Sequence, residues 1–152
     1  MTHLQVGDQA PGFEAKNQLG EVVRLSDYRG KRLILFFYPQ DNSPSCNNEV
    51  CNLRDNYQLF QKQGYELLGV SPDTEKRHQN FIKKFDLPFP LLADTDRAII
   101  RAYGLWGEKK FMGRTFDGVH RTTFIINKKG VIEQVFTKVV TKNHAAQILE
   151  EV

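Results

Sequence analysis

The residues best suited to chemistry are Cys46 and Cys51, the chain's only cysteines, in the segment LFFYPQDNSPSCNNEVC at residues 35–51. They lie five positions apart, soon after an apolar run that is typical of a buried strand. In a compartment that keeps thiols reduced, a close cysteine pair is more often catalytic, redox-active or metal-binding than a structural crosslink. The pair is therefore the first candidate for a reaction centre.

Cys46 stands where a helix is expected to begin. Pro44 favours a helix start near Ser45 or Cys46, because its ring fixes φ at a helical value and restricts the residue before it. The unpaired N–H groups and the dipole at a helix N-terminus favour a thiolate. A nucleophilic cysteine is one interpretation of this position, and a small buried apolar residue near a helix cap is the other.

Cys51 follows on the same expected helix, about 140° around its axis and about 7.5 Å along it from Cys46. Because a disulfide needs Cα atoms within about 6.8 Å, joining the two sulfurs would require at least the first helical turn to unwind. Melting at a helix terminus breaks few internal hydrogen bonds. Inert packing on the inner face of the helix is the alternative interpretation of Cys51.

Two polar residues are expected near Cys46. Ser43 lies three residues before it and is placed to donate a hydrogen bond toward the sulfur or a substrate oxygen, although serine is also a common turn former. Arg121 opens the segment RTTFII, and its guanidinium reaches Cys46 if that strand neighbours the central one. A solvated arginine at a strand entrance is the alternative.

Other uses of the cysteines fit less well. A zinc site needs four ligands, and the four histidines, at positions 3, 78, 120 and 144, show no paired spacing with the cysteines. A thioredoxin-type C-x-x-C motif does not occur, because four residues separate the two cysteines.

The elements that must position these residues alternate between strand and helix. The apolar run RLILFFYP at 32–39 predicts a central strand covered on both faces, and a helix and a second strand, YELLGVSPD, follow it. That order implies a parallel pair joined by a right-handed crossover. The further expected elements are helices within 74–86, 95–104 and 143–152, a short strand at 89–94, a hairpin at 122–136 and an N-terminal hairpin within 13–31 at one edge. For the helix at 95–104, Thr95 or Asp94 is the expected cap and Gly104 the expected end. The pattern predicts one three-layer α/β domain over residues 1–152, with a mixed sheet.

Composition excludes several classes of protein. The chain has 152 residues, is 40% hydrophobic and carries a formal charge of +3, with its basic residues scattered among 18 acidic ones. We therefore expect no nucleic-acid partner. The chain shows neither a signal peptide nor an apolar run approaching the ~18 residues of a membrane span, so we expect a cytoplasmic protein without a membrane partner.

Taken together, several segments resemble the peroxiredoxins, and within them the bacterioferritin comigratory protein or PrxQ subgroup. The similar segments, in order, are VGDQAPGF at 6–13, LSDYRGKRLILFFYP at 25–39, SPSC at 43–46, CNLRDN at 51–56, YGLWGEKKFMGRTFDGVHR at 103–121 and TFIIN at 123–127. The resemblance implies a thioredoxin-like fold and a thiol peroxidase that reduces hydrogen peroxide and organic hydroperoxides to water and alcohols. It also implies thioredoxin as the reductant and no cofactor or metal.

The family's motifs also assign roles to single residues. The resemblance implies that Cys46 is the peroxidatic cysteine, whose sulfenic acid Cys51 resolves as an intramolecular disulfide. Pro39 matches the proline that shields the sulfur, and Ser43 stands where the family has threonine. Glu49 matches an acidic or amide position, and Arg121 matches the arginine that reaches the thiolate. A resolving cysteine on the same chain removes the need for a dimer, so a monomer is expected.

Two other functional classes fit the same residues. In a thiol-based redox sensor or holdase, oxidation of Cys46 would unwind the helix without turnover. A binding module on this fold would need no peroxidase chemistry, although the presence of both cysteines and Arg121 weakens that interpretation.

Overall fold

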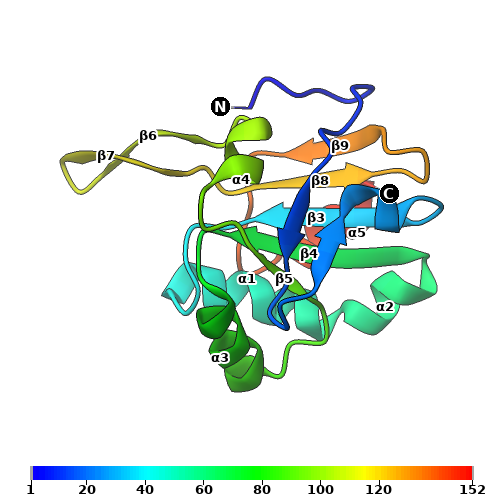
Figure 1. Cartoon of the computed structure of the whole chain (residues 1–152), viewed down its shortest axis with the longest axis horizontal. Helices are drawn as coiled ribbons and strands as arrows, with labels where there is room; N and C mark the ends of the chain where they lie inside the picture. Colours follow the sequence, from blue (N-terminus) through cyan, green and yellow to red (C-terminus); the bar gives the residue numbers. More distant parts are fainter. Residues whose placement is uncertain (1, 152) are drawn as a thin grey trace.

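A five-stranded mixed sheet forms the centre of the protein in the computed structural model, which describes residues 2–151 (Figure 1). The strand order is β5-β4-β3-β8-β9. The strands are β3 (Arg32–Phe37), β4 (Tyr65–Ser71), β5 (Leu91–Ala93), β8 (Thr122–Ile126) and β9 (Ile132–Phe136). β3, β4 and β5 are parallel, and β8 and β9 form the antiparallel part. The mixed sheet and its central strand are as the sequence predicts.

Both faces of β3 are buried, which explains its continuous apolar sequence. Ile34 and Phe36 pack on one face with side chains of α1, α2, α3 and α5. Leu33 and Leu35 pack on the other face with side chains of α4 and of the N-terminal segment. Two apolar layers therefore hold the sheet between helices, which gives the expected three-layer arrangement.

The helices are α1 (Pro44–Asp55), α2 (Tyr57–Lys62), α3 (Glu75–Phe85), α4 (Ala98–Ala102) and α5 (His144–Glu151). The helix expected after β3 is divided at Asn56, whose side-chain amide donates to the carbonyl of Asn52 at 2.9 Å. α4 begins three residues later than expected, at Ala98. The residue at the N-cap is Arg97 rather than Thr95 or Asp94, although the Asp94 carboxylate still accepts the N–H groups of Ile99 and Ile100 in the first turn.

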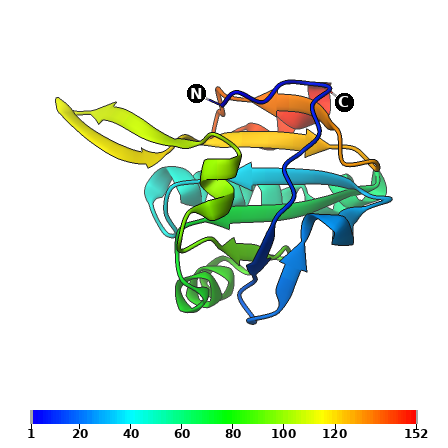
Figure 2. The same ribbon diagram turned by 45° about the horizontal axis from the view of Figure 1, so that its top comes forward.

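Two hairpins stand outside the central sheet. The expected N-terminal hairpin is β1 (Glu14–Lys16) and β2 (Val22–Arg24), followed by the short 3₁₀ helix η1 (Leu25–Tyr28), and it touches edge strand β5 through an Asn17–Leu92 bridge. The second hairpin, β6 (Trp106–Phe111) and β7 (Arg114–Val119), was not predicted from the sequence. It extends away from the body of the protein (Figures 1 and 2).

Within residues 2–151, none of the helices has the length and apolar character needed to cross a membrane.

Candidate active site

Cys46 lies in the first turn of α1, just beyond the carboxyl end of the central strand. Ser43 is the extended residue that precedes the helix, Pro44 is its first residue, and the N–H of Asn47 makes an early helical bond to the carbonyl of Ser43 at 2.8 Å. The helix thus starts at Pro44, close to the expected position. Cys46 is fully buried, so its sulfur faces neighbouring protein groups rather than bulk water.

Arg121 connects this sulfur to a buried carboxylate. It lies just before β8, which pairs with β3 through Phe37 and Thr122, and this pairing brings the arginine to the same end of the sheet as Cys46. Nη2 lies 3.3 Å from Cys46 Sγ, and Nη1 donates to Glu49 Oε1 at 2.6 Å. One guanidinium therefore contacts both the candidate nucleophile and the acid one turn further along α1.

Glu49 is fully buried, and only one of its two carboxylate oxygens is hydrogen-bonded. Its Oε1 accepts from Arg121, but within residues 2–151 no hydrogen-bond partner reaches Oε2. Burial raises the pKa of Glu49 to about 7, against the opposing effect of Arg121. His144 Nε2 lies 3.9 Å from Oε2.

His144 is held neutral behind Glu49. Its Nδ1 lies 2.8 Å from Gln147 Oε1, which already accepts the N–H of Val140, so Nδ1 must carry the proton. Its Nε2 then accepts the hydroxyl of Thr123 at 2.8 Å. Burial lowers the pKa of His144 to about 4, in agreement with this tautomer. Sequence reasoning did not identify His144 as a neighbour of Glu49, because a single histidine on an amphipathic helix has no spacing that relates it to Glu49.

Glu49 and His144 make opposite contributions to the pH dependence of stability. For Glu49 the pKa rises from 4.5 unfolded to about 7 folded, so its contribution to stability is lost as the pH rises through that interval. For His144 the pKa falls from 6.5 unfolded to about 4 folded, so its contribution is lost as the pH falls through that interval. The two effects should largely cancel in the wild type.

Glu49→Gln should remove the contribution of Glu49 to the pH dependence of stability and leave that of His144. The variant should match the wild-type free energy of unfolding near pH 4.5 and become more stable than the wild type above about pH 7, by at most about 3 kcal/mol. Urea denaturation of the reduced protein between about pH 4.5 and pH 8 measures the difference. The same change at exposed Glu108 is the control, and an equal pH-dependent gain there would contradict the prediction.

Cys51 sits on the far side of the same intact helix, half-buried, and both cysteines are free thiols. The residue after it, Asn52, anchors this part of α1, because its side-chain oxygen accepts the N–H of Ala145 in α5 at 2.7 Å. The first turn is held less firmly, since Pro44 and Ser45 are exposed. The outer residues of the first turn are thus exposed, whereas the later part of α1 is bonded to α5.

Ser43 and Pro39 lie on the segment that joins β3 to α1. The hydroxyl of Ser43 donates to the carbonyl of Gln40 at 3.2 Å, so in this structure it is engaged within its own loop rather than with Cys46. Pro39 is half-buried, two residues beyond the end of β3. The roles that the resemblance implies for these two residues stay predictions.

A basic cavity lies beside Arg121. It has a volume of about 340 Å³, and Lys109, His120, Arg121 and Lys138 contribute to its walls. Lys109 donates to the carbonyl of Val119 at 2.8 Å, and burial, together with the charge of Arg121, lowers the pKa of Lys109. The sequence did not identify Lys109, which is brought to the site by the unpredicted hairpin.

Asp41, Asp73 and His78 form a second buried polar cluster, with ligand-type atoms within 4.8 Å of one another. These atoms are already engaged. His78 Nδ1 lies 2.7 Å from Asp41 Oδ2, and its Nε2 lies 2.9 Å from the carbonyl of Leu92, so Nε2 must donate and cannot ligate a metal. The hydroxyl of Tyr38 donates to Asp41 Oδ1 at 2.6 Å. The cluster therefore fixes the loop before Cys46 and does not suit a metal ion.

The chain is similar to known proteins in both sequence and structure. The sequence matches the AhpC/TSA family over residues 6–135. It is 42% identical to peroxiredoxin Bcp of Escherichia coli over 149 residues, which cover 98% of this chain and 96% of that protein. A cysteine-to-serine variant of Xylella fastidiosa PrxQ superimposes with a TM-score of 0.92 at 28% identity, covering 99% of this chain and 96% of that one. The Xanthomonas campestris bacterioferritin comigratory protein, known for alkyl peroxide reduction activity, superimposes with a TM-score of 0.86 at 30% identity, covering 99% and 96%.

Proposed function

Because this chain belongs to the AhpC/TSA family and is a thiol peroxidase similar to the Bcp peroxiredoxins, we propose that Cys46 is its peroxidatic cysteine and Cys51 its resolving cysteine. The observation that carries the proposal is the contact of 3.3 Å between Arg121 Nη2 and Cys46 Sγ at the first turn of a helix. A cation and a helix N-terminus together favour a thiolate at this position.

In the first step, the Cys46 thiolate attacks the nearer oxygen of a hydroperoxide. The S–O bond forms as the O–O bond breaks, which leaves Cys46 as a sulfenic acid and releases an alkoxide or hydroxide that takes up a proton to become alcohol or water. Negative charge builds on the leaving oxygen, and donors aimed at that oxygen lower the barrier. Arg121 donates a hydrogen bond to the sulfur, and Ser43 would join it if its hydroxyl turned away from Gln40.

In the second step, the Cys51 thiol attacks the Cys46 sulfenic acid, forming a disulfide and releasing water. Four residues of helix lie between the two cysteines and keep their sulfurs apart, so α1 must unwind at its first turn before this bond forms. The exposure of Pro44 and Ser45 and the anchoring of Asn52 to α5 support unwinding from the N-terminal end.

The substrate and the reductant complete the proposal. Alkyl hydroperoxides are proposed as substrates alongside hydrogen peroxide, on the strength of the Xanthomonas campestris protein's activity. A thioredoxin-type dithiol is proposed to reduce the disulfide, and because both cysteines lie on one chain, the cycle is proposed to run in a monomer.

The number of turnovers separates an enzyme from a redox sensor. With thioredoxin, its reductase and NADPH, the wild type should consume many equivalents of cumene hydroperoxide, with NADPH oxidation as the measurement. Consumption that stops near one equivalent per chain, with the reductant still present, would favour the sensor. Cys46→Ser, which removes the nucleophile, provides the background rate.

A further inference from the structure

The β6–β7 hairpin projects from the body of the protein as an arm (Figure 2). Its outer end presents apolar side chains to solvent. Among residues 2–151, eight large apolar side chains are exposed, and three of them lie within six positions of this hairpin. Phe111 is 67% exposed, Met112 86% and Phe116 47%. Clustered exposure of this kind, unlike scattered apolar residues, is typical of a contact surface.

The turn at the tip makes Met112 the least expected of these residues. Met112 and Gly113 form the two-residue connection between paired Phe111 and Arg114, with φ values of 51° and 78°. A turn with positive φ at both central residues favours Asn-Gly, because asparagine tolerates the left-handed region better than methionine does. The methionine therefore adds backbone strain and almost no burial, so its identity is not explained by the fold.

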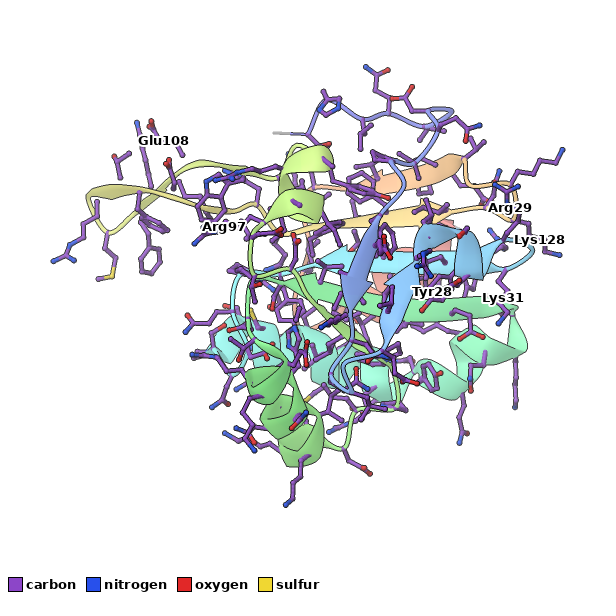
Figure 3. All side chains as sticks on the ribbon, in the orientation of Figure 1. Tyr28, Arg29, Lys31, Arg97, Glu108 and Lys128 are labelled. Atoms are coloured by element: carbon purple, nitrogen blue, oxygen red, sulfur yellow. The ribbon has the colours of Figure 1, made fainter. Side chains whose placement is uncertain are left out.

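The outer half of the hairpin is also basic. Lys109, Lys110 and Arg114 lie within residues 109–116, and that segment contains no acidic residue. In the strand register, Lys109 faces Phe116 and Phe111 faces Arg114, so aromatic and basic side chains share one face. Glu108, labelled in Figure 3, and Asp117 pair with each other one step closer to the body.

We propose that this outer half, residues 109–116, docks on the surface of an anionic lipid bilayer. Met112 and Phe111 enter the interface between headgroups and acyl chains, while Lys110 and Arg114 extend their charged ends to lipid phosphates. Apolar side chains at a tip flanked by basic residues and without acidic ones suit a negatively charged surface that also accepts apolar groups. The expectation of no membrane partner came from the missing membrane span, which does not bear on surface binding.

Docking through this arm would bring the active site close to the lipid surface. β7 ends two residues before Arg121, and Lys109 of β6 lines the same cavity as Arg121. Hydroperoxides of membrane lipids are then natural substrates for Cys46, an extension that rests on the proposed peroxidase function.

Vesicle binding tests the proposal without any peroxide. The wild type should cosediment with vesicles of equal parts phosphatidylglycerol and phosphatidylcholine at low salt, and only weakly with phosphatidylcholine alone. The double variant Phe111→Ser, Met112→Asn should bind about tenfold more weakly. Met112→Asn places the preferred residue in the turn, so loss of binding cannot be assigned to a weakened hairpin.

Two matched controls locate the effect. Leu19→Asn changes an apolar residue of similar exposure, 69%, in the β1–β2 turn and should bind like the wild type. Lys110→Glu should weaken binding, whereas Lys128→Glu, at the opposite end of the molecule from the hairpin in Figure 3, should weaken it less. Equal binding by the double variant and the wild type, or equal wild-type binding to both vesicle types, would overturn the proposal. So would a tip variant that leaves vesicle binding unchanged but raises the KM for thioredoxin or alters self-association.

Peroxidase activity provides a second, independent test of the docking proposal. The double variant should reduce cumene hydroperoxide in solution at the wild-type rate but reduce vesicle-borne phospholipid hydroperoxide about tenfold more slowly. A wild type that binds vesicles but reduces neither peroxide would refute the peroxidase proposal and leave the docking surface intact. Unequal rates on cumene hydroperoxide would instead place the tip in the chemistry and contradict the docking interpretation.

Discussion

Arg121→Ala is expected to slow the reaction of Cys46 with peroxide by about 100- to 1,000-fold, which is the effect of removing a donor aimed at developing negative charge. Alkylation of Cys46 by iodoacetamide, which needs the thiolate but no donor to a leaving peroxide oxygen, should slow only a few-fold. The difference arises because a more acidic thiol is also a weaker nucleophile, so thiolate formation alone changes the rate little. Stopped-flow consumption of one equivalent of peroxide, compared with the alkylation rate, measures both effects.

Two further variants keep this result interpretable. Arg121→Ala leaves the buried carboxyl group of Glu49 without its partner, whereas the double variant Arg121→Ala, Glu49→Gln replaces this titratable group with an amide and should show the same selective loss. Arg121→Lys keeps a positive charge but loses the two-pronged geometry that contacts Glu49 and Cys46 together, so it should recover only part of the rate. Equal losses in the peroxide and alkylation assays would mean that Arg121 acts through the thiolate alone.

The parts of the fold and of the site that could be predicted depend on neighbours along the chain or across the sheet. The run at residues 32–39 identified a central strand because both faces of β3 are buried. The proximity of Arg121 to Cys46 followed from one assumption, that the strand at 122–126 pairs with the central strand, and the register of Phe37 with Thr122 satisfies it. The helix start before Cys46 followed from the backbone restriction imposed by Pro44.

The parts that could not be predicted depend on contacts between distant segments. Asn52 in α1, for example, accepts a hydrogen bond from the N–H of Ala145 in α5, 93 residues later. The contact between Glu49 and His144 likewise joins two helices whose spacing in the sequence carries no signal. The β6–β7 hairpin was missed because most of its side chains are exposed and its Met-Gly turn lacks the asparagine that usually marks such turns.

Cys51→Ser should separate the first turnover from recycling. The variant should consume the first equivalent of peroxide at the wild-type rate, because Cys51 is not among the groups that contact Cys46 in the reduced structure. Its steady-state rate with thioredoxin should fall on the order of a hundredfold or more, because the sulfenic acid no longer has an internal thiol to attack it. Peroxide consumption in single-turnover and steady-state assays measures the two rates.

Trapping the intermediate tests the same variant directly. Dimedone should label Cys46 of the oxidised Cys51→Ser protein in high yield and the oxidised wild type in low yield, since the wild type converts its sulfenic acid to a disulfide. An unimpaired steady state would show that Cys51 is not the resolving cysteine, and equal labelling of the two proteins would show that no disulfide competes for the sulfenic acid.

The unwinding of α1 that the disulfide requires also predicts where backbone amides lose their protection from hydrogen exchange. Because Asn52 is bonded to α5, hydrogen exchange in the oxidised wild type should increase from Asn47 to Val50 and remain slow around Ala145. The oxidised Cys51→Ser protein, which cannot form the disulfide, should keep α1 protected throughout.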